Sequence, residues 1–418
     1  MEDRTPGLHH VTAVTADLNR NVEFYTRILG MRLVKRTINF DDPGSYHLYY
    51  GNGKGSPGTL LTFFHRPAAR KGRPGSGTVS SVAFSVPEGS LEYWRDRLSS
   101  HDIALHGAEG RYDGDCVAFT DPDGLSLALV SAPAPDARIP WEKGPVPAGH
   151  ALRGIHAVTL AAAGRTSVES FLTGTLGFRR VWEVGSRLQF ATGSGGSGAI
   201  ACVDVLSDPF PGRGGFGTVH HVAWRIPSRA AQESWRRTIG EAGHSVTPVI
   251  DRLYFRSIYF REPGGILFEI ATDGPGIAVD EPLEALGETL VLPPWLEGKR
   301  RTIEDPFLPL RRPRPHDGAG RRLPHPRSPP GHYGTSRLLR RASSFRPLHR
   351  RYRPPTPWTR YTERRSSTGQ RARLCFGSAR TPWRRARESR RPPSGRSRGR
   401  RRSPSTARKP RECRRRIR

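Results

Sequence analysis

The chain has 418 residues and a formal net charge of +30, but this charge is not spread evenly. Residues 311–418 hold 35 Arg and one Lys against four acidic residues, a net charge of +32, so the first 310 residues carry −2. The near-neutral part is long and apolar enough to bury a core, whereas a segment of Arg, Pro and Ser cannot repay its ordering entropy. The charge therefore excludes a uniformly basic protein and predicts that the first three quarters are folded.

The four cysteines are scattered, with neither a CxxC pair nor an even spacing. This pattern argues against a disulfide framework and against a zinc knuckle. The first ten residues lack the basic and apolar regions of a signal peptide, and no apolar run approaches the roughly 18 residues of a membrane span. We expect a soluble cytoplasmic protein without a membrane partner.

The first elements along the chain belong to a module that is written twice. The strand-like segment GLHHVT at residues 7–12 returns as GIHAVT at residues 154–159. Asp17 is a suitable N-cap for a helix that ends at Gly30, and the corresponding helix runs from about Ser167 to Gly177. The segments FYTRILGMR and FLTGTLGFR are therefore one element in two copies.

Later segments repeat as well. GTVSSVAFSVP from residue 77 matches GTVHHVAWRIP from residue 217, and TDPDGLSLALV from residue 120 matches REPGGILFEIA from residue 261. Alternating apolar runs predict further strands between turns, namely RLVKRTINF, YHLYYG, TLLTFF, RLQFAT and GAIACVDV. Each half is thus an α+β module of a strand, a helix and several strands, and the two halves would form two curled sheets.

These patterns divide the chain into four predicted segments: an N-terminal module at residues 5–131, a linker at 132–149, a C-terminal module at 150–305 and a basic tail at 306–418. The tail has few aromatic residues and no folded recognition module, so we favour a disordered extension over a nucleic-acid-binding arm. A single Lys among so many Arg is also what out-of-frame reading of GC-rich DNA would give.

The repeat serves as an internal control, because fold positions should stay similar in both copies while site positions differ. Three positions have a metal-competent side chain in one copy and a small residue in the other, namely His10 against Ala157, His221 against Ser81 and Glu269 against Ala128. If the first strand of one half lies beside the late strands of the other, His10, His221 and Glu269 meet in one site. Two His and one carboxylate with open positions suit non-haem Fe(II).

Structural roles compete with this interpretation. A histidine at a strand start is more often a core or capping side chain than a ligand, and His9 aligns with another histidine, His156, which favours a shared structural role. Period-two alternation predicts that His220 and His221 point to opposite faces, so that one of the pair reaches a metal. Three polar residues in or after an Asp-Asp-Pro-Gly turn are placed outside the site, namely Asp41, Asp42 and His47.

At these residues the chain resembles the vicinal oxygen chelate superfamily, and within it the ring-cleaving dioxygenases that act on hydroquinones. The resemblance covers roughly residues 5–305 and rests on GLHHVT, LVKRTINFDDPGSYHLYYG, GSPGTLLTFF, GTVHHVAW, YFRSIYFREPGGILFE and LPPWLE. It implies tandem βαβββ modules that form open, curled mixed sheets. It also implies an Fe(II) ion, with Mn(II) as the alternative, held by His10, His221 and Glu269.

The family further implies a substrate pocket around that metal, formed by His9, Thr12, His220, Arg252 and Tyr259. Arg252 would hold developing negative charge, while His220 or Tyr259 would move protons. The alternatives are that Arg252 pairs with a nearby carboxylate and that Tyr259 is an amphipathic strand residue. The substrates would be a small aromatic diol and O2, and we expect a homo-oligomer.

Two other functions compete with ring cleavage. A glyoxalase-like isomerase or thiol transferase on the same fold usually calls for a fourth protein ligand, and the equivalent positions in the other copy offer none. A metal-free protein that binds an aromatic ligand would not need the intact set of His10, His221 and Glu269. The sequence therefore favours the dioxygenase.

Overall fold

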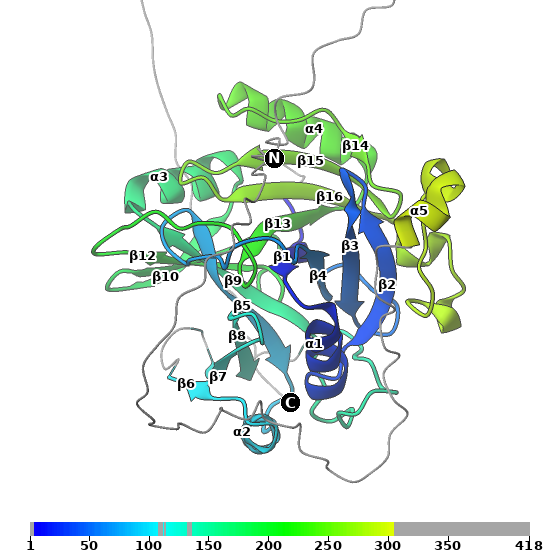
Figure 1. Ribbon diagram of the computed structural model, residues 1–418. Helices are drawn as coiled ribbons and strands as arrows, with labels where there is room; N and C mark the ends of the chain where they lie inside the picture. The colour runs from blue at the N-terminus through cyan, green and yellow to red at the C-terminus, as the bar shows by residue number, and fades with distance from the viewer. Residues whose placement is uncertain (1–3, 108–111, 113, 132–135, 305–418) are drawn as a thin grey trace, which may run out of the picture. The chain divides into compact units, whose positions relative to one another are not determined.

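The computed structural model describes residues 4–107, 112, 114–131 and 136–304. The basic tail predicted at residues 306–418 and residues 132–135 of the predicted linker lie outside the described residues. In the described part of the chain the strands form two eight-stranded sheets, with helices beside them (Figure 1).

The first sheet combines strands from both ends of the folded part. Its members are β1 (Leu8–Thr15), β2 (Arg32–Asn39), β3 (Asp42–Gly51), β4 (Leu60–His65), β13 (Val219–Ile226), β14 (Ile250–Asp251), β15 (Phe255–Arg261) and β16 (Leu267–Pro275). Their order is β14-β15-β16-β13-β1-β4-β3-β2, with β1 antiparallel to β13 and parallel to β4. The first strand of the N-terminal half therefore lies beside the late strands of the C-terminal half, as the site prediction required.

The second sheet is nested between these two groups in the sequence. Its members are β5 (Thr78–Val86), β6 (Leu105–His106), β7 (Asp115–Thr120), β8 (Ser126–Ser131), β9 (Gly154–Ala162), β10 (Arg179–Val184), β11 (Arg187–Ala191) and β12 (Ile200–Val205). Their order is β10-β11-β12-β9-β5-β8-β7-β6, with β5 antiparallel to β9 and parallel to β8. The second sheet thus repeats the strand pattern of the first.

One helix separates the first and second strands of each βαβββ unit. The helical segments are α1 (Leu18–Glu23), η1 (Phe24–Ile28), α2 (Leu91–Ser100), α3 (Arg165–Ser170), η2 (Phe171–Thr175), α4 (Arg229–Glu241), η3 (Ile277–Val279), η4 (Leu283–Ala285), η5 (Pro294–Lys299) and α5 (Arg300–Glu304). Each half of the sequence contains two such units. The predicted α+β class with curled mixed sheets is confirmed, and each module proves to be a pair of units.

The first helix shows how local sequence sets an element. Asp17 caps it as predicted, because its Oδ1 accepts hydrogen bonds from the backbone N–H groups of Asn19 and Arg20 at 3.0 and 3.1 Å. The helix is not uniform up to Gly30, since α1 passes into the wider π-helical turn η1 at Phe24. The corresponding helix α3 has the same two parts and begins at Arg165, two residues before the predicted start.

Alternation along β1 separates the core from the site. Val11 and Ala13 are fully buried in the main apolar cluster of the protein. His10 and Thr12 occupy the alternate positions and project from the opposite face of the strand. A buried apolar face thus anchors the strand, while its polar face remains for chemistry.

The two sheets are joined by a pair of connecting segments, residues 66–77 and 206–217. These segments form isolated bridges with each other, namely Lys71 with Phe216, Arg73 with Arg213 and Ser76 with Pro211. Their backbones approach so closely that a Cβ atom on Gly215 would lie 2.2 Å from the carbonyl oxygen of Arg70. Glycine is required at this position because a side chain would clash with backbone.

The segment after β16 is fixed to β2 by charge as well as by apolar contacts. Lys35 is fully buried, and its Nζ lies 2.5 Å from both Asp280 Oδ1 and Glu281 Oε2. Removing either carboxylate would leave the buried ammonium group of Lys35 with only one counter-charge. None of the helices in the described ranges combines the length and hydropathy that crossing a membrane would require.

Candidate metal centre

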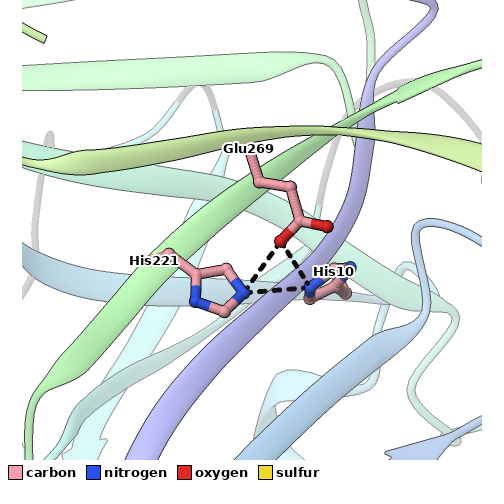
Figure 2. A group of neighbouring side chains, drawn as sticks. All are labelled: His10, His221 and Glu269. Carbon is pink, nitrogen blue, oxygen red and sulfur yellow. Dashed lines mark hydrogen bonds and ion pairs between the residues drawn. The ribbon is translucent and has the colours of Figure 1, made fainter. Parts of the chain in front are cut away.

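Three buried side chains, those of His10, His221 and Glu269, converge on one face of the first sheet, as Figure 2 shows. His10 Nε2 and His221 Nε2 are 3.1 Å apart, and Glu269 Oε2 lies 3.5 Å from the first and 3.1 Å from the second. Ligands about 2.1 Å from one ion at right angles to each other would stand about 3 Å apart. The three donor atoms are therefore spaced like one face of an octahedral site.

Three neighbouring strands supply these side chains. His10 comes from β1, His221 from β13 and Glu269 from β16, and β13 pairs with both other strands. The first lies about two hundred residues before the others in sequence, so the site exists only when both halves are folded together. The juxtaposition predicted from the repeat is present in the structure.

Electrostatics favours the protonation states of Glu269 and His221 that a cation needs. Burial alone would raise the pKa of Glu269, but its interactions with the imidazoles of His10 and His221 hold that pKa well below its ordinary value. Burial lowers the pKa of His221 and outweighs its interactions with Glu269, so its imidazole stays neutral. The site therefore offers a cation the carboxylate of Glu269 and the neutral imidazole of His221.

An unsatisfied atom also marks the site. Glu269 Oε1 accepts a hydrogen bond from Ser257 Oγ at 2.5 Å, whereas the buried Oε2 faces the Nε2 atoms of His221 and His10 and makes no hydrogen bond of good geometry among the described residues. A buried carboxylate oxygen without a partner is costly and requires an explanation. A divalent cation between Oε2 and the two imidazoles would provide one, so the donor set fits a metal ion.

The preceding histidine of each pair supports the candidate ligand. His9 Nδ1 lies 2.9 Å from His10 Nδ1, and His220 Nδ1 lies 2.8 Å from His221 Nδ1. If the Nε2 atoms of His10 and His221 face a metal, their Nδ1–H groups donate to these neighbours and fix the tautomers. Burial and the adjacent His221 lower the pKa of His220 to about 3, which leaves it neutral and able to accept.

The prediction that His220 and His221 point to opposite faces is wrong. Register shifts after Thr12 in the β1–β13 ladder place a β-bulge at His220, and the two rings are 5.1 Å apart between centroids. A similar shift after Leu8 makes His9 the extra residue beside His10. A bulge breaks strict alternation and re-aims side chains, and hydropathy patterns do not reveal it.

The predicted pocket residues Arg252 and Tyr259 lie beside this group. Arg252 Nε donates to the Tyr259 hydroxyl at 3.2 Å, and the Tyr259 ring is 5.9 Å from the ring of His221. The guanidinium also contacts both carboxylate oxygens of Asp41, at 3.0 and 2.9 Å. Burial would lower the pKa of Arg252, but Tyr259 and Asp41 raise it above its ordinary value. Both predicted environments of Arg252 are therefore present: it has a carboxylate partner and it borders the site.

Two residues placed outside the site from sequence lie next to it. Asp41 occupies the turn between β2 and β3 and reaches Arg252 at the opposite edge of the sheet. His47 Nε2 is 2.9 Å from Thr62 Oγ1, which is 2.7 Å from Thr12 Oγ1. The signal available in the sequence was the alternation of β3, which puts His47 and Tyr49 on one face.

The corresponding position in the second sheet is filled by protein. Ala157, Ser81 and Ala128 stand at the three places, and Tyr112 packs into the apolar cluster around them. The Tyr112 hydroxyl donates to Ser81 Oγ at 3.4 Å. The three histidine and carboxylate donors of the first sheet therefore have no equivalent among the described residues of this cluster.

A large surface hollow lies elsewhere in the described part of the protein. It measures about 1010 Å³ and is bordered by Arg32, Trp141 and Leu286, with none of the three candidate ligands in its wall. Its size is no argument for catalysis, because the three converging donors of the described residues lie outside it. The chemistry of the donor set identifies the centre on the first sheet instead.

The fold and this site define the class of protein. The chain belongs to the Glyoxalase/Bleomycin resistance protein/Dioxygenase superfamily, whose family model matches residues 7–129 and 154–270. The resemblance to the vicinal oxygen chelate superfamily is therefore confirmed. Each matched range contains one copy of the sequence repeat.

Relatives of nearly full length are named as ring-cleaving enzymes. The chain is 42% identical over 312 residues to MhqO of Bacillus subtilis (strain 168), named a ring-cleaving dioxygenase, covering 74% of this chain and 98% of that protein. It is 33% identical over 320 residues to the chlorohydroquinone/hydroquinone 1,2-dioxygenase of Sphingobium indicum, covering 74% and 99%.

Solved structures agree on the fold. A crystal structure of a protein from Bacillus subtilis subsp. subtilis str. 168, named a dioxygenase, is 41% identical and covers 74% of this chain and 98% of its own, with a TM-score of 0.70. Glyoxalase I from Zea mays, at 13% identity, covers 68% of this chain and 97% of its own with a TM-score of 0.51, and this likeness concerns the fold alone.

Proposed function

We propose that the protein is a non-haem Fe(II)-dependent dioxygenase that opens the ring of a hydroquinone-type aromatic diol with O2, with Mn(II) as the alternative metal. The observation that carries the proposal is the buried set of His10, His221 and Glu269 around an unsatisfied carboxylate oxygen. The relatives named as ring-cleaving dioxygenases support the same reaction. Two His and one carboxylate leave coordination positions for substrate and dioxygen.

His10, His221 and Glu269 would hold the ion. When bound, Fe(II) would lower the pKa of a coordinated hydroxyl group and supply electrons to dioxygen. The protein shields this region, since Phe255 packs against the rings of His9 and His10, and Phe64 packs against His221. Apolar walls keep bulk water away from a reactive ring.

Proton handling falls to the residues beside the donor set. His220 is neutral and partly buried, and its Nδ1 accepts from His221, so its proton lies on Nε2 and can be offered to an oxygen of the bound diol. Burial and Glu269 raise the pKa of Tyr259, which keeps its phenol protonated as a donor. Arg252 is oriented by Tyr259 and Asp41, and its charge can stabilise negative charge that develops on the opened ring. His9 and Thr12 complete the proposed substrate contacts.

The glyoxalase-like alternative is less well supported. The group formed by the described residues has three members, and the equivalent positions in the second sheet are Ala157, Ser81 and Ala128. A metal-free binding protein would gain nothing from a buried carboxylate oxygen held against two imidazoles. Both alternatives remain open to the experiment that follows.

Oxygen uptake by the full chain tests the proposal. Protein loaded with Fe(II) under anaerobic conditions should consume O2 with hydroquinone, and isotope-labelled dioxygen should place both oxygen atoms in the ring-opened product. Parallel samples with Mn(II) and with catechol define the metal and the ring. Tight binding of hydroquinone without oxygen uptake would favour the binding protein instead. Cytoplasmic localisation and homo-oligomerisation belong to the proposal and are checked by fractionation and light scattering.

A further inference from the structure

A chain of four polar side chains crosses the inner face of the first sheet and ends at Thr12. The Tyr49 hydroxyl is 3.0 Å from His47 Nδ1, His47 Nε2 is 2.9 Å from Thr62 Oγ1, and Thr62 Oγ1 is 2.7 Å from Thr12 Oγ1. Tyr49, Thr62 and Thr12 are buried, and His47 is partly buried. The chain spans the adjacent strands β3, β4 and β1.

The protons of these four hydrogen-bonded side chains can be assigned by starting from the Tyr49 hydroxyl. Among the described residues, His47 Nδ1 is the one hydrogen-bond partner of the Tyr49 hydroxyl, so the phenol donates to it. Burial raises the pKa of Tyr49, which keeps this proton in place. A neutral His47 then carries its proton on Nε2 and donates to Thr62, whose own hydroxyl proton goes to Thr12.

This assignment leaves the hydroxyl proton of Thr12 without an acceptor among these four hydrogen-bonded side chains. The ladder between β1 and β13 is regular from His10 to Thr12, so the two side chains project from the same face. Thr12 is also the direct cross-strand neighbour of His221. Its hydroxyl thus lies beside the candidate ligands with a proton to donate.

We propose that His47 is a positioning residue, which through Thr62 fixes the Thr12 hydroxyl as a hydrogen-bond donor to an oxygen of the bound aromatic diol. The inference rests on the proposed function for the identity of the acceptor. It assigns a role to a residue of β3 whose hydrogen bonds go to Tyr49 and Thr62 and not to the candidate ligands. Without His47, the Thr12 hydroxyl would be free to turn its proton toward Thr62.

The tautomer of His47 tests the first step without metal or turnover. In the metal-free full chain, labelled with nitrogen-15 in its histidines, the His47 signal should show a protonated Nε2 and an unprotonated Nδ1. Loss of that signal in His47→Gln provides the assignment. A proton on Nδ1 would overturn the inference, because the chain would then run in the opposite direction.

Substrate affinity tests the second step. For hydroquinone binding to Fe(II)-loaded protein without O2, Thr62→Val should weaken affinity about tenfold, as expected for one lost hydrogen bond. Thr62→Ser keeps the hydroxyl and should stay within about twofold of the wild type. Iron content and melting temperature, measured for each variant, confirm that only the link has changed.

A double-mutant cycle separates positioning from packing. His47→Leu should cost about tenfold in affinity in the wild type but less than about twofold in the Thr62→Val background, where the link is already broken. Equal costs in both backgrounds, or equal affinities of the Val and Ser variants, would overturn the inference alone. A wild-type protein that binds no hydroquinone would overturn the proposed function, while the tautomer result would still report on the chain.

Discussion

The two sheets carry equivalent strands, yet one holds a candidate metal centre and the other a small apolar core. Both have a bulge in the strand that contains the first histidine, at His9 in one sheet and at His156 in the other. The first sheet follows its bulge with His10, whereas the second follows it with Ala157 and fills the space with Tyr112. The difference teaches that the same strand arrangement can form with or without the side chains that would bind a metal.

Removing the carboxylate should abolish the difference between the sheets. Glu269→Gln takes away the charged donor that faces both imidazoles, so bound Fe(II) should fall from roughly one ion per chain to near zero and oxygen uptake should cease. Iron content after gel filtration measures this. Ala128→Glu, which places a carboxylate at the equivalent position of the second sheet, should add no iron, because Ala157 and Ser81 offer no imidazole.

Truncating the supporting histidine should sharpen the comparison. His9→Ala removes the partner of His10 Nδ1 and should weaken Fe(II) affinity about 10- to 100-fold. The matched control is His156→Ala, whose side chain contacts Ser197 in the second sheet and should leave iron affinity unchanged. Competition with a chelator gives both affinities. Equal behaviour of the two variants would assign His9 the structural role that the repeat suggested.

The turn before the last strand of the N-terminal half should make the stability of the protein depend on pH. Burial raises the pKa of Asp121 to about 6 in the folded protein. Its folded pKa lies above the unfolded value, so its stabilising contribution is present below about pH 4 and is lost as pH rises through about 6. Relative to the wild type, Asp121→Asn should gain on the order of 2 kcal/mol in free energy of unfolding between these limits.

Denaturant unfolding at pH 4 and pH 7 measures this change. Glu262→Gln is the comparison in the other half, since Glu262 accepts the equivalent turn hydrogen bonds from the backbone of Gly264 and Ile266. A pH-independent difference between Asp121→Asn and the wild type would show that the pKa of Asp121 is the same in the folded and unfolded protein.

The smallest effect is expected from the basic tail. Ending the chain after residue 305 should leave oxygen uptake and iron affinity unchanged, because the described folded part already contains all candidate ligands. A side-by-side assay of the shortened and full chains checks this. Loss of active protein on truncation would contradict the view of the tail as an inert extension.

Much of the site could be predicted because the repeat supplied its own control. Matched losses at Ala157, Ser81 and Ala128 identified three donors that the structure brings together. The side-chain directions of His9 and His220 could not be predicted, since they depend on bulges that hydropathy does not record. Long-range contacts such as that between Asp41 and Arg252 were also hidden, because they arise only when the sheet curls.

The strand pattern shows the same limits. The longer alternating runs were predicted correctly, but β6 and β14 have two residues each and β10 is an exposed edge strand, so none of the three has a clear pattern. Tyr112 was overlooked because packing beside Ala128 and Ala157 in the second sheet requires only one ring. A single aromatic residue in a loop has no periodic signal.

In the sequence, all strands of the second sheet lie between β4 and β13 of the first sheet, and this arrangement also sets an order of assembly. Strands β5 to β12 form one uninterrupted stretch, whereas β1 must find β13 after about two hundred intervening residues. Closing so long a loop costs entropy, but a completed inner sheet brings the two bridged connecting segments together and shortens the effective loop. During synthesis, His10 would leave the ribosome first and meet its partners last. A nascent chain could therefore capture a metal at this centre only after β16 has emerged.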